Sequence, residues 1–318
     1  MLARLGVLPL LAALTCSAVA QEFPTRSIRI IVPFASGSAT DLTARPLAKE
    51  ITAATGQQVL VDNRPGGEGQ LGAQLAAAAK PDGYTVMVST QTTQAANVSV
   101  YKNLPYHPVD SFVPITGIRQ GALIVLARRD LGMTNIKDIV AFAKKEPGKL
   151  MFGSSNGSSR AGGEYFKLLA GIDMLHVPYR GQPQAMTDLA GGRLDLTFTD
   201  MYTGLPFIKD KRAVAVAVTS ARRLAILADV PTIAESGVPG YELGAWTAVF
   251  APAGMPRPVV DRLNALFRTA IDTPSFKEQS AQSGAVLFPG TPEELGAFQR
   301  AEIEKWARIV KAAGMQEP

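Results

Sequence analysis

Two glycine-containing stretches have the residue types that cofactor binding or nucleophilic catalysis requires. The first, GEGQLG at residues 67–72, matches G-x-G-x-x-G. A dinucleotide site with this pattern needs a strand running straight into the first glycine and an acidic residue about 20 positions further on. Asn63 to Gly66 separate the expected strand from that glycine, and Met87 to Thr90 hold no acid. We therefore interpret the stretch as a loop that opens an alanine-rich helix, and we predict no cofactor.

The second stretch, residues 153–157, matches G-x-S-x-G, the pattern of a nucleophile elbow centred on Ser155. α/β-Hydrolases need an acid and then a histidine after this serine. Only His176 follows, within the apolar stretch MLHVPY. A serine hydrolase using Ser155 therefore stays open as the enzymatic alternative.

Metal and nucleotide-phosphate sites lack their usual ligands. The two histidines are far apart in the sequence, and the single cysteine, Cys16, falls near the start of the chain. Neither glycine-rich loop contains the G-K-[ST] of a phosphate-binding loop. We predict no metal site, although the sequence leaves a site made only of carboxylates open.

Two serine-rich loops each follow an apolar strand and open a helix. In such a loop, backbone N–H groups, small hydroxyls and a helix N-terminus converge, which favours an anion. Either loop alone could be an ordinary turn, but two of them predict a ligand clamped between two domains. The candidate residues are Phe34, Ala35, Ser36, Gly37, Ser38, Asp41, Ser154, Ser155, Asn156, Gly157, Ser158, Ser159 and Arg160.

Two sets of alternating strands and helices are expected to position these loops, as in parallel β-α units. In the first set, strands at 27–34, 57–63 and 84–90 alternate with helices. Pro46 implies that the helix near 41–55 starts late or kinks. The second set begins after Phe112, and two sets imply two sheets. YELGAWTAVFAP could return as a strand to the first sheet, and the tail is helical, with Thr291 and Glu294 as a capping box.

The first 20 residues have the pattern of a secretory signal peptide, with an early cation, an apolar run and a small-residue cleavage site ending at Ala20. A lipid-anchored Cys16 is the alternative. Subtracting these residues, which include Arg4, from 318 residues and a net charge of +5 leaves 298 residues and +4. Basic residues occur at most in pairs, which indicates solvated faces rather than nucleic-acid binding. We expect a soluble protein in an exported compartment.

Five motifs carry a resemblance that covers the chain from about residue 23 to 314. IRIIVPFASGSATDLTAR, VDNRPGGEGQLGA, HVPYRGQPQAMTDLAGGRLDLTF, VPTIAESGVPGYELGAW and APAGMPRPVVDRLN, in this order, resemble the extracytoplasmic solute receptors of the tripartite tricarboxylate transporter family, the Bug-type binding proteins. This implies an α/β, two-domain type II periplasmic-binding-protein fold, in which each domain is a sheet flanked by helices and crossing strands join the domains. Such a fold closes like a hinge on a small carboxylate. We expect domain 1 at 21–122 and 242–318, and domain 2 at 123–241.

The resemblance also implies further ligand-binding positions and leaves two roles open. Asp200 either faces the ligand or caps the helix that follows it. Arg160, where the family commonly has histidine, either binds a second carboxylate or points into solvent. The further positions are Ser89, Thr90, Gln91, Asn97, Gly181, Gln182 and Asp200.

The implied function is that of a periplasmic receptor that passes a carboxylate to the membrane subunits of a secondary transporter. Such a receptor is monomeric and makes or breaks no bond. A sensor that reports the ligand to a membrane kinase is the other alternative, because it would differ only in its partner.

Overall fold

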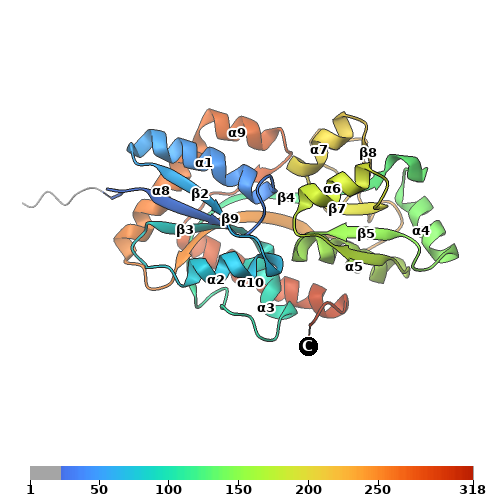
Figure 1. Ribbon diagram of the computed structural model, residues 1–318, viewed down its shortest axis with the longest axis horizontal. Helices are drawn as coiled ribbons and strands as arrows, with labels where there is room; N and C mark the ends of the chain where they lie inside the picture. The colour runs from blue at the N-terminus through green and yellow to red at the C-terminus, as the bar shows by residue number, and fades with distance from the viewer. Residues whose placement is uncertain (1–22, 318) are drawn as a thin grey trace, which may run out of the picture.

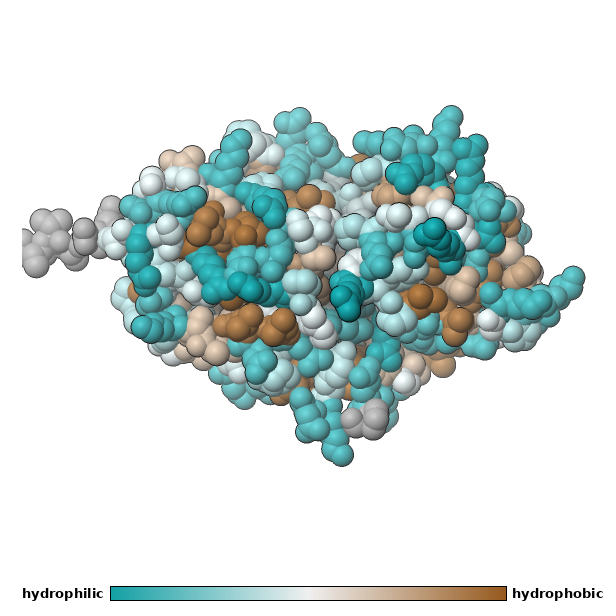
Figure 2. Space-filling model, in the orientation of Figure 1, coloured by the Kyte–Doolittle hydropathy of each residue, from teal (hydrophilic) through white to brown (hydrophobic). Residues whose placement is uncertain are grey.

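The computed structural model describes residues 23–317 (Figure 1). The predicted signal peptide, with Cys16 and the cleavage site after Ala20, lies outside the described residues. Within residues 23–317, no helix is both long and apolar enough to cross a bilayer. On the face shown in Figure 2, hydrophilic residues predominate and the apolar groups form small, separated patches.

The first lobe is built on a parallel sheet with one central strand. Its strands are β1 (Ile28–Val32), β2 (Val59–Asn63) and β3 (Thr85–Thr90). β1 pairs with both neighbours, and its Ile30 and Ile31 are fully buried, as its uninterrupted apolar sequence predicts. The helices of this lobe are α1 (Ala39–Thr55), α2 (Gln70–Ala77), α3 (Asn97–Val100), α8 (Arg257–Asp272), α9 (Pro274–Ala281) and α10 (Pro292–Ala312).

The second lobe repeats the alternation of strands and helices. Its strands are β5 (Met151–Ser154), β6 (Leu175–Pro178), β7 (Leu196–Asp200) and β8 (Ala213–Val218). β5 lies between β6 and β7 and is parallel to both. Its helices are α4 (Ile136–Lys145), α5 (Gly157–Ala170), α6 (Gln182–Ala190) and α7 (Met201–Lys209).

Two long strands, β4 (Phe112–Arg128) and β9 (Gly244–Pro252), cross between the lobes (Figure 1). The first part of β4 pairs with β9, and its last part pairs with β7 and β8. β9 also pairs with β3, as predicted for a strand returning to the first sheet. Hydrogen bonding therefore continues through β4, and the two expected sheets share this strand. The two-residue strand β10 (Val286–Leu287) also pairs with β4.

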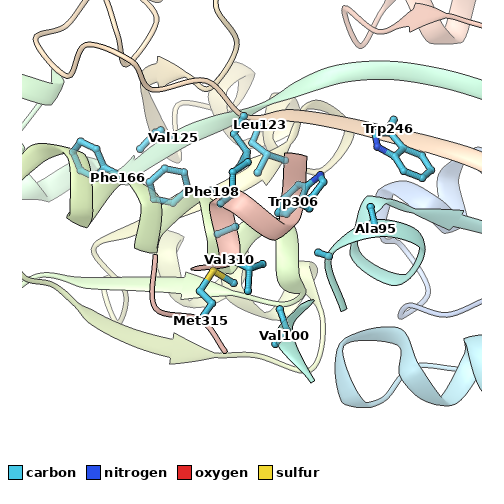
Figure 3. Packing of buried hydrophobic residues seen from close by; sticks show 14 of the residues in the cluster. Ala95, Val100, Leu123, Val125, Phe166, Phe198, Trp246, Trp306, Val310 and Met315 are labelled. Carbon is cyan, nitrogen blue, oxygen red and sulfur yellow. The ribbon is translucent and has the colours of Figure 1, made fainter. Parts of the chain in front are cut away.

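The C-terminal helix α10 shares one apolar cluster with both lobes. Figure 3 shows Trp306 of α10 near Leu123 of β4 and Phe198 of β7. Trp306 is almost completely buried, and the same cluster includes Phe250 of β9. The predicted capping box starts this helix, because Thr291 and Glu294 make both reciprocal bonds. One core therefore extends beneath the junction of the two lobes.

Helix α1 begins at Ala39 and continues through Pro46, so the alternative of a late start is wrong. Proline has no backbone N–H, which leaves the carbonyl of Leu42 without its helical donor. The side-chain amide of Gln279, in α9, donates to this carbonyl at 3.5 Å. A neighbouring helix thus supplies the bond that the proline removes.

The GEGQLG stretch forms a loop, as predicted. β2 ends at Asn63, and α2 begins only at Gln70. Between them the chain has positive φ angles of 145° at Gly66, 54° at Gly67, 51° at Glu68 and 88° at Gly69. Consecutive left-handed residues of this kind strongly favour glycine. The loop therefore reverses the chain into α2 and lacks the strand-to-glycine turn of a dinucleotide site.

Candidate functional site

A cavity of about 880 Å³, its opening included, lies between the two lobes. Residues of both lobes and of the crossing strands line it. Twelve of the residues expected from the sequence are among them: Phe34, Ala35, Ser38, Thr90, Gln91, Ser155, Asn156, Ser158, Ser159, Gly181, Gln182 and Asp200.

Four helices of the described chain begin at this cavity. The residues that precede α1, α5, α6 and α7 are Ser38, Asn156, Gly181 and Asp200, and all four line it. The first N–H groups of a helix have no acceptor within the helix, and the helix dipole adds partial positive charge there. The cavity is therefore surrounded by sites that favour an anion.

The loop before α5 uses most of its donors within the protein. The Asn156 side chain accepts from the Ser159 N–H at 3.0 Å, and the Ser159 hydroxyl accepts from the N–H groups of Ser155 and Asn156. The Ser158 N–H donates to the Thr92 hydroxyl at 3.3 Å. The expectation that all these N–H groups converge on a ligand is therefore corrected, because they form a capping box and a contact between the lobes.

The two serines of the nucleophile-elbow pattern have different partners. The Ser155 hydroxyl donates to Gln182 Oε1 at 2.7 Å. It is Ser154 whose hydroxyl lies 2.7 Å from His176 Nε2. Ser154 is only 2% exposed and lies outside the cavity lining. Burial lowers the pKa of His176, whose ring stacks on Phe152. The serine that lines the cavity is thus not the serine that contacts a histidine.

Side-chain bonds join the lobes across the cavity. Gln91, after β3, donates to the Ser158 hydroxyl at 2.7 Å and accepts from the Trp246 N–H at 2.8 Å. The hydroxyls of Thr92 and Ser158 lie 2.8 Å apart. These contacts connect β9 and the end of β3 to the start of α5, so the lobes are closed on each other.

Arg119 of β4 brings a cation into the cavity and is only 4% exposed. Its guanidinium lies 4.0 Å from the centre of the Tyr202 ring. It donates to the Tyr202 hydroxyl and, at 3.3 Å, to the carbonyl of Ala39. Burial lowers the pKa of Arg119 to about 10, so the group is cationic at neutral pH.

Asp200 is the one acidic residue that lines the cavity within the described chain. Its carboxylate accepts from the Thr203 N–H at 2.9 Å and from the Thr203 hydroxyl at 2.9 Å. Burial raises the pKa of this carboxyl. Of the two roles that the sequence left open, the structure shows the helix cap.

Two threonine hydroxyls in the cavity lack partners within the described chain. Thr199 of β7 and Thr247 of β9 are 1% and 7% exposed, and both line the cavity. Neither Oγ1 atom has a hydrogen-bond partner. Buried hydroxyls are normally paired, so this cavity has unused hydrogen-bonding capacity on both sides.

Eight predicted residues of the described chain lie outside the cavity lining: Ser36, Gly37, Asp41, Ser89, Asn97, Ser154, Gly157 and Arg160. Asp41 instead receives the Gly37 N–H and pairs with Arg45 at 2.9 Å. Arg160 pairs with Glu317 at 2.7 Å, which links α5 to the C-terminal segment. The structure thus brings Arg160 to a contact between the lobes, and neither alternative considered for it is what the structure shows.

Sequence reasoning missed the contributions of the crossing strands. Arg119, Trp246 and Thr247 lie within strands rather than in the serine-rich loops that the motifs indicate. The sequence did contain one indication of Arg119: in the stretch FVPITGIRQGALIVLAR, residues 112–128, it is the only charged residue before the final arginine. A charge inside a largely apolar run has to find a polar environment when the strand is buried.

No group of three or more His, Cys, Asp or Glu side chains within residues 23–317 is placed to hold a metal ion.

Comparisons with known proteins agree with this architecture. The model of the tripartite tricarboxylate transporter family receptor matches residues 43–315. The UPF0065 protein in the tcbD-tcbE intergenic region of Pseudomonas sp. (strain P51) is 37% identical over 306 residues, 94% of this chain and 91% of that protein.

Two solved structures are also similar over nearly their whole length. R. palustris Rpa4515 with adipate has a TM-score of 0.89 at 33% identity and covers 92% of this chain and 99% of its own. The periplasmic binding protein BugD has a TM-score of 0.89 at 34% identity, with 93% and 100% covered. The predicted fold, two α/β lobes joined by crossing strands, is confirmed.

Proposed function

Because the chain belongs to the tripartite tricarboxylate transporter receptor family, we propose that it captures a small organic carboxylate between its lobes and delivers it to the membrane subunits of a transporter. The receptor works in the periplasm, after removal of residues 1–20, and acts as a monomer. The adipate in the similar Rpa4515 structure supports a carboxylate ligand.

One observation carries this proposal: the cavity offers hydrogen-bond donors and positive charge that the protein itself does not neutralise. The N-terminus of α6, which has no side-chain cap, the buried Arg119 and the unpaired hydroxyls of Thr199 and Thr247 surround one space. A carboxylate would accept from several of these donors, and each charge-assisted bond contributes about 1.5–3 kcal/mol.

The domain boundaries, 21–122 with 242–318 and 123–241, belong to this proposal. The arrangement of β4 and β9 supports them, since both strands cross between the lobes close to Ala122 and Glu242. Opening at these crossings would break the contacts of Gln91 and Thr92 with Ser158 and admit the ligand.

Thermal unfolding in the presence of mono-, di- and tricarboxylates, amino acids and aromatic acids tests the proposal. A ligand at 100 times its dissociation constant should add about 2.7 kcal/mol of stability. Isothermal titration calorimetry then gives the affinity. If no acid stabilises the protein and an ester is hydrolysed instead, the receptor function is wrong.

A further inference from the structure

We propose that Arg119 is the specificity-determining residue of the cavity and binds a second carboxylate of the ligand, so that the receptor prefers dicarboxylates to monocarboxylates. This inference rests on the proposed receptor function.

The first argument is the burial of this charge without a counter-ion. No carboxylate of the described chain lies within ion-pair distance of the Arg119 guanidinium. Its partners there are a tyrosine hydroxyl, a tyrosine ring and a carbonyl oxygen, all uncharged. A buried charge that lacks an opposite charge is costly to the folded state. An anionic ligand group beside Arg119 would remove that cost when it binds.

Asp200 is the obvious candidate for the missing counter-ion, and its bonds argue against that role. Both of its carboxylate oxygens accept from Thr203, and they cap α7. It attracts Arg119 only through space, without a direct contact. Burial also raises the pKa of Asp200.

The second argument is that the Arg119 side chain is held in place before ligand arrives. The Tyr202 hydroxyl accepts from Arg119 and donates to the carbonyl of Gln279 at 3.3 Å, so the tyrosine is itself fixed. Ala39, which accepts from Arg119, begins α1, and Tyr202 lies in the first turn of α7. The guanidinium therefore lies beside two helix N-termini, and its planar, multiple donors match a carboxylate. Tyr202 acts as a positioning residue.

The second arginine of the lining, Arg180, is exposed. Water screens a charge in this position, so it contributes much less to discrimination between ligands than a buried one. The lining hydroxyls that still lack a partner within the described chain, those of Thr199 and Thr247, are neutral donors. We therefore assign one carboxylate to the neutral donors and the other to Arg119.

The test compares ligands that differ only in the second carboxylate. Adipate, its monoamide and hexanoate have the same chain length, and shorter diacids with their monoacids extend the series. We expect the wild-type protein to bind the best diacid roughly 10- to 100-fold more tightly than its monoacid, the range of one charge-assisted bond. Arg119→Gln should weaken binding of the diacid without changing binding of the monoacid, so the ratio of the two affinities should fall close to one. Arg119→Lys, which keeps the charge but loses the planar fork, should keep part of the ratio.

Arg26→Gln is the matched control, because Arg26 also stacks on a tyrosine ring, that of Tyr84, at 3.9 Å but lies outside the cavity. It should leave the ratio unchanged. If the wild-type protein binds diacid and monoacid equally, or if Arg119→Gln weakens both alike, the inference is overturned while the receptor function stands. If no acid in the wider panel binds, the receptor function itself fails. If Arg119→Gln does not fold, the ratios of diacid to monoacid affinity in the wild-type protein and in Arg119→Lys still test the inference.

Discussion

At the scale of single residues, the cavity separates side chains whose bonds are complete from side chains that still have bonding capacity. Gln182 and Ser155 bond to each other, and Asp200 is occupied by Thr203. Thr199 and Thr247, in contrast, keep free hydroxyls. The first group shapes the cavity, and we expect the second group to contact ligand.

Replacing Thr247 with Val should change ligand affinity more than stability. The hydroxyl has no partner to lose, and valine has nearly the same shape, so the free energy of unfolding should stay within about 0.5 kcal/mol. If the hydroxyl binds ligand, affinity should fall about 2- to 10-fold, the range of one neutral hydrogen bond. Calorimetric titration and urea unfolding measure the two effects.

Thr219→Val is the control for this substitution. The Thr219 hydroxyl accepts from the Leu123 N–H at 2.8 Å and donates to the Leu243 carbonyl at 2.8 Å, where β4 meets the chain before β9. Its loss leaves buried groups unpaired, which should cost about 1–3 kcal/mol of stability. Equal destabilisation by both substitutions would show that Thr247 is structural.

At the scale of elements, the sequence predicted most of what forms the cavity walls. Continuous apolar strands, helix caps and serine-rich loops are local signals, and β1, β3 and the start of α5 lie close to where those signals place them. β4 was not predicted, because its glycines and Pro114 interrupt the apolar run and its partners are distant in sequence. Arg119 was missed with it, since only pairing with β9 and β7 brings this residue between the lobes.

Asp200→Asn should separate the two roles considered for Asp200. Asn caps helices about as well as Asp, so stability should change little, whereas Asp200→Ala should cost about 0.5–2 kcal/mol through loss of the α7 cap. If Asp200 also receives an amine or hydroxyl of the ligand, the Asn variant should lose affinity at full stability. Unfolding and titration of both variants decide between the roles.

Helix α5 depends on a glycine for its packing. A Cβ at Gly163 would lie 2.1 Å from the Phe152 ring, so Gly163→Ala should destabilise the protein by about 1–3 kcal/mol despite the better helix propensity of alanine. Gly296 of α10 is the matched control, because its nearest contact would be Pro114 at 3.4 Å. Gly296→Ala should be neutral or add up to about 1 kcal/mol. Thermal unfolding of both variants measures the difference, and similar effects would contradict the assigned contact.

At the scale of the whole molecule, the lobes meet at the cavity, in the shared apolar core and in a polar cluster. In the polar cluster, Arg160 of α5 pairs with Glu317 after α10. Glu68, from the glycine-rich loop before α2, belongs to this cluster and has a buried Oε2 without a partner. An ionised Glu68 is therefore poorly compensated when the lobes are closed.

The burial of Glu68 predicts how the stability of the protein changes with pH. Burial raises the pKa of Glu68 above 4.5, although Arg160 and Tyr101 oppose the shift. The folded protein then holds a proton that the unfolded chain has released, so the contribution of Glu68 to stability is greatest below pH 4.5 and falls as pH rises through the folded pKa. Glu68→Gln should remove this decrease in stability, because glutamine does not titrate. The stability of the variant relative to wild type should therefore increase from pH 4 to pH 8.

Glu235→Gln is the control with the opposite sign. Hydrogen bonds from the Thr232 backbone and from Arg223 lower the pKa of Glu235, so its carboxylate stabilises the fold above pH 4.5 and loses this effect as pH falls. This variant should become less stable relative to wild type as pH rises. Urea unfolding of the three proteins at each pH gives the differences. If the free energy of unfolding of Glu68→Gln changes with pH as that of wild type does, burial does not shift the pKa of Glu68. Closure of the lobes would then have no free-energy cost at this carboxyl.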